Sequence, residues 1–232
     1  MSKTAILVDG GFYRKRAKKL WGQHSPQETA SGLITYVRRH LKEHVYHHEL
    51  YRIFYYDCAP VNKQMYHPLL KRTVNLGATP DYSWMCDFLN CLKEKRKVAL
   101  RLGFLDDTNS VYTLSYSSVK KLCNGTLSPD ALTEKDFELT IRQKGVDMKI
   151  GMDIASLAYK HQVEQIVLIA GDSDFVPAAK LARREGLDFV LDPMEMEISK
   201  DRDLFEHIDG KRSCGNPYKR EKNMEGNDQF KV

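Results

Sequence analysis

The chain has 232 residues, 42% of them hydrophobic, which suits one α/β domain with elaborations. No apolar run approaches the length of a membrane span, and the run from Thr4 to Val8 meets Asp9 too soon for a signal peptide. Five cysteines without a CxxC spacing argue against a disulfide framework and a thiolate zinc site. We therefore expect a cytoplasmic protein that does not enter membranes.

The formal net charge of +5 is unevenly distributed along the chain. Residues 210–232 hold six Lys or Arg against three Asp or Glu, so this segment contributes more than half of the excess. We expect residues 1–209 to form the folded domain and 210–232 to be a basic, disordered tail. A general polyanion-binding protein would be more basic than this.

Lys3 to Asp9 reads KTAILVD, which predicts a buried strand with a carboxylate at its carboxyl end. Two glycines follow and allow a sharp turn or a close approach of the backbone to a ligand. Phe12 to Trp21 has helical character, and Arg14 and Lys18 share a face because they lie one turn apart. Such a basic run is typical of a solvated helix face, but its place after an acidic strand end also suits contacts to phosphates.

Residues 33–44 are expected to be helical, and residues 49–57 form a third candidate strand that ends in Asp57. Four histidines invite a zinc interpretation, since positions four apart on a helix can share an ion: His40, His44, His47 and His48. The neighbourhood adds only two glutamates and no cysteine to such a site. We therefore favour a solvated basic helix end.

The middle of the chain is less regular. Residues 63–97 are expected to be mostly helical, and 98–105 form a strand. Residues around 106–133 carry turn-forming residues without a steady period, which predicts an insertion that expands the domain. A helix-like stretch leads to Gly145, and a helix with Asp147 at its start follows. Asp153 lies six positions on, about 240° further round, so it shares a face with Asp147 only if the helix start is irregular.

The stretch from Gln165 to Ala170 is apolar and β-branched, as in a strand buried on both faces of a parallel sheet. Asp172, Ser173 and Asp174 follow on a turn, and helical spacing begins after them. Ligands of open α/β sheets bind outside the carboxyl ends of strands. Asp174 could instead only cap the helix, but capping needs one carboxylate and the turn has two.

The alternation of strands and helices predicts a Rossmann-like, three-layer α/β/α fold with a parallel sheet. In such a fold the carboxylates of Asp9, Asp147, Asp172 and Asp174 gather at strand ends and helix starts. Carboxylates at one edge repel one another unless they share protons or bind cations. Mg²⁺ uses carboxylates, waters and substrate phosphates as ligands, so metal-assisted phosphodiester hydrolysis is a suitable chemistry.

Three segments together resemble the NYN domain family, a branch of the PIN-like nuclease fold: Asp9-Gly10-Gly11, QKGVD at 143–147 and GDSDFVP at 171–177. The resemblance covers most of the chain. It implies an acidic pocket that binds Mg²⁺ or Mn²⁺ and a ribonuclease activity. Many members have an asparagine soon after the first aspartate, where this chain has Gly11, Phe12 and Tyr13, so a contact made by that asparagine is missing here.

The resemblance assigns catalytic and metal-binding roles to Asp9, Asp147, Asp172 and Asp174. We also expect Asp153 as a further metal ligand. Predicted nucleic-acid contacts are Arg14, Lys18, Lys149 and Ser173. Stacking on bases could involve Tyr55, Tyr56, Tyr82 and Trp84, although aromatic residues near apolar runs more often lie in the core. The expected partner is RNA, single-stranded rather than duplex, and a homodimer is left open.

Two other classes of function compete with a ribonuclease. The first is a non-catalytic RNA-binding or regulatory module that keeps the fold and a cation site. The second is a hydrolase of small phosphate esters. The chain lacks the second aspartate that a haloacid-dehalogenase phosphatase has two residues after the first, the GxxxxGK[ST] of P-loop enzymes and the GxGxxG of dinucleotide dehydrogenases.

Overall fold

The computed structural model describes residues 2–42, 48–197 and 206–219, without the side chains of residues 107–109 and 173. The chain folds into two compact units. The first contains residues 1–57, 87–103 and 145–232, and the second contains residues 58–86 and 104–144. None of the helices in the described ranges has the length and apolarity that crossing a membrane requires.

The first unit is built on parallel strands in the order β2-β1-β7-β8-β9. Their bounds are β1 Lys3–Asp9, β2 Glu49–Cys58, β7 Gln165–Ile169, β8 Asp188–Asp192 and β9 Gly210–Lys211. Val8 pairs with Ile169, and Ile169 pairs with Asp192, so these three strands end at one edge. Ala5 to Val8 and Ile166 to Ile169 are at most 1% exposed, as in a sheet covered on both faces.

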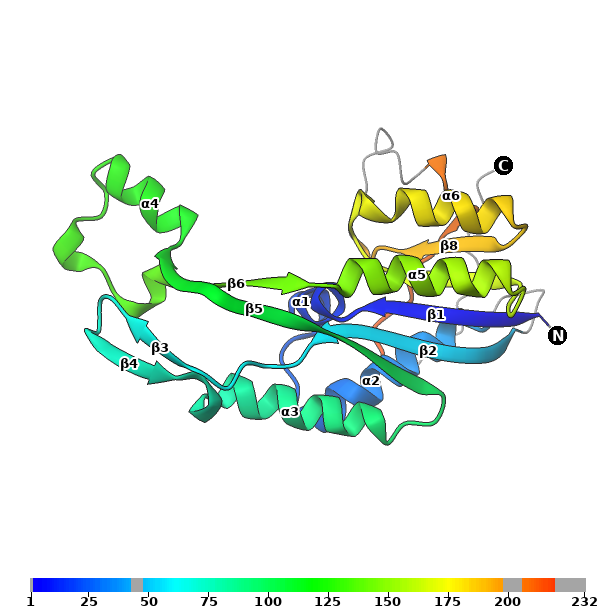
Figure 1. Cartoon of the computed structure of the whole chain (residues 1–232), viewed down its shortest axis with the longest axis horizontal. Helices are drawn as coiled ribbons and strands as arrows, with labels where there is room; N and C mark the ends of the chain where they lie inside the picture. The colour runs from blue at the N-terminus through cyan, green and yellow to red at the C-terminus, as the bar shows by residue number, and fades with distance from the viewer. Residues whose placement is uncertain (1, 43–47, 198–205, 220–232) are drawn as a thin grey trace. The chain divides into compact units, whose positions relative to one another are not determined.

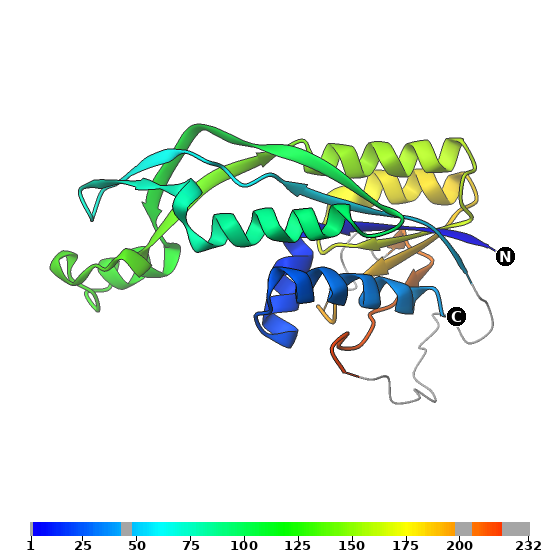
Figure 2. The same cartoon turned by 90° about the horizontal axis from the view of Figure 1, so that it is seen from below.

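Helices cover both faces of this sheet (Figures 1 and 2). One face carries α5 (Val146–Tyr159) and α6 (Val176–Arg184), which pack side by side, and the other carries α1 (Gly10–Trp21) and α2 (Pro26–His40). The start of α2 is fixed by a capping box between Ser25 and Glu28. The predicted mixed α/β fold, with a mostly parallel central sheet flanked by helices, is confirmed.

The second unit contains the hairpin of β3 (Gln64–His67) and β4 (Arg72–Asn75) and the antiparallel pair of β5 and β6 (Phe137–Lys144). Strand β5 (Val98–Leu114) begins in the first unit, and α3 (Pro80–Lys93) also has residues in both. The remaining elements are η1 Leu76–Ala78, α4 Tyr116–Cys123, η2 Pro129–Ala131 and η3 Glu134–Asp136. Buried His67 packs against Tyr112 and Phe137, with ring centroids 4.4 and 5.2 Å away.

Two predicted elements are wrong. Residues 63–97 are not mostly helical, because β3 and β4 form before α3 begins at Pro80, and β3 alternates exposed and buried residues with the period of a strand. The approach to Gly145 is also a strand, β6, along which half-buried residues alternate with exposed ones as far as Ile141. The alternation of buried and exposed positions in these short strands was not apparent in the sequence, because the segments contain many polar residues.

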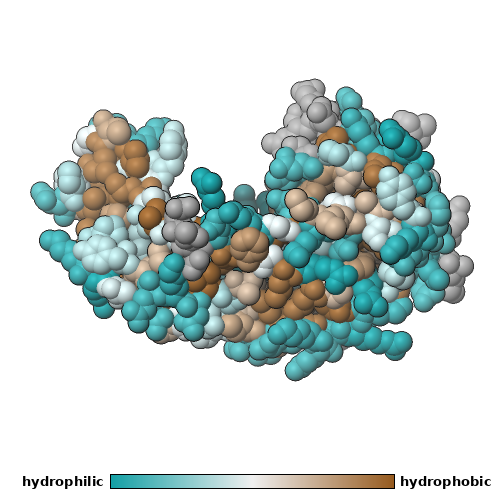
Figure 3. Space-filling view, viewed as in Figure 1, coloured by the Kyte–Doolittle hydropathy of each residue, from teal (hydrophilic) through white to brown (hydrophobic). Residues whose placement is uncertain are grey.

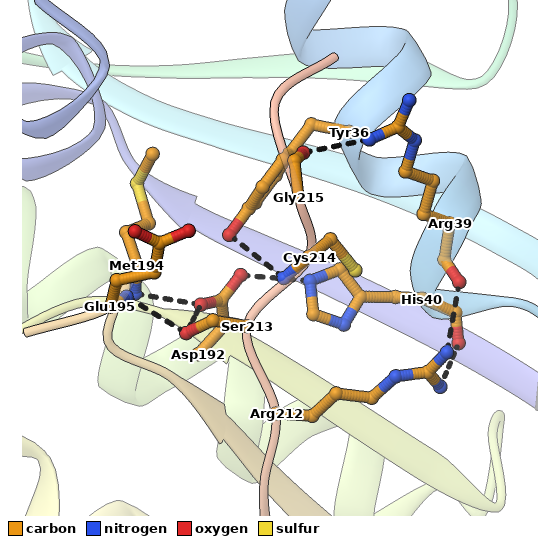
Figure 4. Close-up of polar contacts among 10 residues, drawn as sticks. All are labelled: Tyr36, Arg39, His40, Asp192, Met194, Glu195, Arg212, Ser213, Cys214 and Gly215. Atoms are coloured by element: carbon orange, nitrogen blue, oxygen red, sulfur yellow. Dashed lines mark hydrogen bonds and ion pairs between the residues drawn. The ribbon is translucent and has the colours of Figure 1, made fainter. Parts of the chain in front are cut away.

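The prediction of disorder from residue 210 is also wrong at its start. Gly210–Lys211 adds strand β9 to the sheet, and Cys214 is buried. Arg212 donates hydrogen bonds to the carbonyl oxygens of Arg39 and His40 at the end of α2, and Arg39 donates to the carbonyl oxygen of Gly215 in return (Figure 4). Residues 220–232 lie outside the described part of the chain.

Gly10, the first residue of α1, is predicted to resist substitution. A Cβ added to it would lie 2.5 Å from Asp57 Oδ2 and 2.5 Å from the hydroxyl of Tyr55, and both side chains are buried. We expect Gly10→Ala to lower the free energy of unfolding by about 1–3 kcal/mol through overpacking. Gly151→Ala is the matched control, because its Cβ would meet no atom within 4 Å and alanine favours a helix. Urea unfolding that finds Gly10→Ala as stable as the control would contradict this packing argument.

Candidate functional site

Parallel strands bring the first two predicted site residues to the same edge of the sheet. Asp9 is the last residue of β1, and Asp172 lies three residues after the end of the adjacent strand β7. Asp9 also caps α1, because its Oδ1 accepts a hydrogen bond of 3.1 Å from the backbone N–H of Phe12. The carboxylate of Asp9 is therefore held in place by the helix that it begins.

Helix α5 brings Asp147 to this cluster. Gly145 precedes the helix with a φ of 81°, a left-handed conformation that glycine adopts without strain. Asp147 then lies exposed in the first turn, and α5 packs against residues 173–175, which include Asp174. The negative charges of Asp172 and Asp174 both act on Asp147.

The aspartates of the 171–177 segment are exposed. The backbone N–H of Asp174 donates to Asp172 Oδ1 at 3.2 Å, within a short 3₁₀ turn, η4 (Ser173–Phe175). The interpretation of Asp174 as a cap of the following helix is wrong, because α6 has Phe175 at its N-cap position and no side-chain cap. Helix capping therefore does not explain the second carboxylate of this turn.

Mutual repulsion is visible in the acid–base properties of the cluster. Burial raises the pKa of Asp9, and the negative charges of Asp147 and Asp57 raise it further, although the N–H of Phe12 works in the opposite direction. Burial also raises the pKa of Asp147, followed by the charges of Asp172 and Asp174. Asp9, Asp147, Asp172 and Asp174 therefore form one electrostatically coupled group, which we name the acidic cluster.

The acidic cluster offers the donor chemistry of a site for a hard divalent cation. It supplies oxygen donors only, it places them at the edge where α/β folds bind ligands, and a cation would relieve the repulsion that raises two of the pKa values. Among the described residues, however, no three His, Cys, Asp or Glu side chains are close enough to hold an ion together. Rotation of the exposed aspartates or phosphate oxygens of a substrate would have to complete the coordination.

Cation binding should weaken in mild acid. Carboxylates with raised pKa values take up protons at a higher pH than ordinary aspartates, whose value is 3.8, and protons compete with a cation for the same oxygens. The folded protein conversely gains stability from these two groups below that value, and loses it as the pH rises through their raised pKa values. Mn²⁺ titrations at decreasing pH should show an affinity that already falls before the pH reaches 3.8. An affinity that stays constant down to that pH would contradict the assignment.

Two other aspartates are not counted in the acidic cluster, because each forms an ion pair with an arginine. Asp153 was predicted as a metal ligand, but its Oδ2 is 2.9 Å from Arg101 Nε and accepts a hydrogen bond of 2.8 Å from the hydroxyl of Tyr56. Its position on α5, about 240° around the helix axis from Asp147, brings it to Tyr56 of β2 and Arg101 of β5 instead. Asp57 is 1% exposed and forms a bidentate pair with Arg14, with two distances of 3.0 Å.

The predicted nucleic-acid contacts differ in their positions. Arg14 forms an ion pair with Asp57, so we assign to its guanidinium a role in stabilising the fold rather than in binding a phosphate. Lys18 is exposed in the last turn of α1, about 12 Å along the helix from its start. Lys149 is exposed on α5, two residues after Asp147. Ser173 begins η4, and its side chain is outside the described part.

The aromatic residues suggested for stacking include two that the structure places in the core. Tyr55 and Tyr56 are 0% exposed, so they cannot meet a base. Tyr82 and Trp84 are half-buried on α3. The exposed apolar side chains near the acidic cluster lie instead on α5, where sequence reasoning did not look for them.

A further carboxylate at this edge of the sheet, Asp192 at the end of β8, was not predicted. It is fully buried, and Figure 4 shows its partners: His40 Nε2 lies 2.8 Å away, and Ser213 Oγ and the backbone N–H of Met194 donate to it at 2.8 and 2.7 Å. His40 is 1% exposed, so the prediction of a solvated helix end is wrong for this residue. His44 and His47 lie outside the described residues.

Asp192 and the acidic cluster differ in how their charges are compensated. Burial acts to lower the pKa of His40, but the neighbouring Cys214 and Asp192 raise it to about 10, which favours an imidazolium beside Asp192. In the described residues no ion pair involves Asp9, Asp147, Asp172 or Asp174. The strand ending LDFVLD was a signal for Asp192, but its histidine partner lies 152 positions away in the sequence.

Comparisons with known proteins identify the family of this chain. A family model described as the NYN domain matches residues 87–204, just over half of the chain. The curated proteins give no match. Among solved structures, a protein of unknown function from Vibrio parahaemolyticus RIMD 2210633 is similar, with 14% identity, a TM-score of 0.47, and coverage of 93% of this chain and 94% of that chain. NYN domains are PIN-like and typically nucleases. This chain belongs to the NYN domain family.

Proposed function

We propose that this protein is a metal-dependent ribonuclease that hydrolyses phosphodiester bonds at the acidic cluster. The observation that supports this most directly is the electrostatic coupling of four carboxylates from β1, α5 and the turn after β7, in a chain of a typically nucleolytic family. Within the described residues these carboxylates have no protein cation as a partner. A group of this kind suits Mg²⁺ or Mn²⁺.

The residues of the acidic cluster have different roles, because some are held in place by the fold and others lie on an exposed turn. Asp9 is partly buried and capped, so it provides a fixed oxygen, whereas Asp172 and Asp174 lie on an exposed turn and adjust to the substrate. A bound divalent cation supplies a water molecule of lowered pKa and neutralises charge on the phosphate oxygens. In the reaction a new P–O bond forms to water oxygen, the bond to the leaving oxygen breaks, and that oxygen takes up a proton.

Single-stranded RNA is the proposed substrate because of the outward face of α5. Met148, Met152 and Tyr159 are 71%, 65% and 62% exposed. Their spacing places them within about 40° of one another around the helix. Figure 3 shows apolar surface over this helix. Met148 follows Asp147 directly, and Lys149 adds a cation for a phosphate, so unpaired bases could lie on α5 while the backbone enters the cluster.

The deciding experiment is incubation of highly purified protein with labelled single-stranded RNA in Mg²⁺, in Mn²⁺ and in EDTA. We expect cleavage that requires the cation and that is slower on a duplex of the same sequence. Salt-dependent retention of RNA without cleavage in either cation would overturn the ribonuclease and favour the RNA-binding module. Cleavage of a small phosphate ester but not of RNA would instead indicate the third class of function.

A further inference from the structure

Phe12 contacts Asp9 of the acidic cluster and the residue that precedes Asp172. Its backbone N–H donates to Asp9 Oδ1 at 3.1 Å. Its ring lies directly against Gly171, the residue before Asp172: a Cβ built on Gly171 would be 2.4 Å from Cε2 and 2.9 Å from Cδ2 of Phe12. One residue in the first turn of α1 therefore fixes the carboxylate of β1 and packs on the turn that follows β7.

The need for glycine at position 171 arises from this ring and not from the backbone. Gly171 does not have a positive φ, so any amino acid could adopt its backbone conformation. The other atom that a Cβ would approach is Met196 Cε, at 2.8 Å, and this is the end of a flexible side chain. The aromatic ring, attached to a helix whose cap is Asp9, has less freedom to move.

We propose that Phe12 is a positioning residue that sets the separation of Asp9 from Asp172, and with it the affinity of the acidic cluster for a divalent cation. Asp172 itself lies on an exposed turn whose described polar contact is the N–H of Asp174, so the contact between Phe12 and Gly171 is the link from this turn to α1. The inference rests on the proposed function and adds the residue that arranges the ligands.

The test is a double-mutant cycle on Phe12 and Gly171 with Mn²⁺ binding as the readout, measured by the electron paramagnetic resonance signal of the free ion. Phe12→Ala should weaken binding about 10-fold, in the range typical of residues that orient metal ligands. Gly171→Ala alone should weaken Mn²⁺ binding more than Phe12→Ala does, because the added methyl group and the ring of Phe12 cannot occupy the same space. The double variant should bind as well as Phe12→Ala alone, since the methyl group then fills the vacated volume.

Two further variants separate positioning from stability. Phe12→Tyr keeps the ring and should retain wild-type affinity, and Leu20→Ala removes a half-buried side chain from the same helix and should lower the melting temperature without changing affinity. For cleavage, Phe12→Ala should lower kcat with KM for RNA within about twofold. Two outcomes would overturn this inference alone, provided that the wild-type protein binds Mn²⁺. The first is an affinity of Phe12→Ala equal to that of the wild type. The second is a double variant in which the losses of binding free energy of the two single variants simply add. An absence of Mn²⁺ binding by the wild-type protein would overturn it together with the proposed function.

Discussion

Asp172→Asn should reduce metal-dependent cleavage of single-stranded RNA by at least about 100-fold. The change keeps the shape of the side chain but removes one negative charge from the acidic cluster, where Asp172 acts on Asp147. Loss of residues that only orient ligands costs about 10–100-fold, so loss of a ligand should cost more. The measurement is the initial rate at saturating Mn²⁺, compared with the wild-type protein from the same purification.

The same variant should remain folded, which distinguishes a site residue from a structural one. Asp172 is exposed and surrounded by like charges, so we expect Asp172→Asn to unfold in urea at or slightly above the wild-type midpoint. Asp87→Asn provides a control for a neutralised exposed aspartate in the same unit, on α3, and should keep full activity. Unchanged cleavage by Asp172→Asn would remove the acidic cluster from the mechanism.

Asp192→Ala should behave in the opposite way and lower the free energy of unfolding by about 3–5 kcal/mol. Asp192 is fully buried and 2.8 Å from the Nε2 of a histidine that is itself 1% exposed. Removal of the carboxylate leaves His40 buried without its ionic partner and deprives Ser213 and Met194 of an acceptor. Urea unfolding of Asp192→Ala beside Asp172→Asn compares two aspartates of one sheet edge.

The pH dependence of stability gives an independent check on this pair. The pKa of His40 is raised from 6.5 to about 10 in the folded protein. A raised pKa means that the pair stabilises the fold fully below pH 6.5 and that this contribution is lost as the pH rises through about 10. The loss should be smaller in Asp192→Ala, where Cys214 is the neighbour that still raises this pKa. An alkaline stability profile that is the same in both proteins would contradict the contribution of Asp192 to the charge of His40.

The sequence by itself determined the parallel part of the fold. The runs AILV at residues 5–8 and IVLI at residues 166–169 are apolar at every position, as in a strand covered on both faces, and the helices between the strands have a clear period. The carboxylates Asp9, Asp147, Asp172 and Asp174 could be named for a local reason too, because each follows a strand or begins a helix. Strands and helix starts of this kind can be recognised from a stretch of about ten residues.

Only the tertiary structure decided which charged residues have partners. Asp153, Asp57 and Asp192 look like the cluster aspartates in sequence, yet Arg101, Arg14 and His40 compensate them. The partners come from other elements, 43 to 152 positions away, and no local pattern encodes such a distance. The β3–β4 hairpin and β6 were missed for a related reason: each of these strands has at least one row of exposed residues, so pairing with a partner strand, rather than burial, marks them as strands.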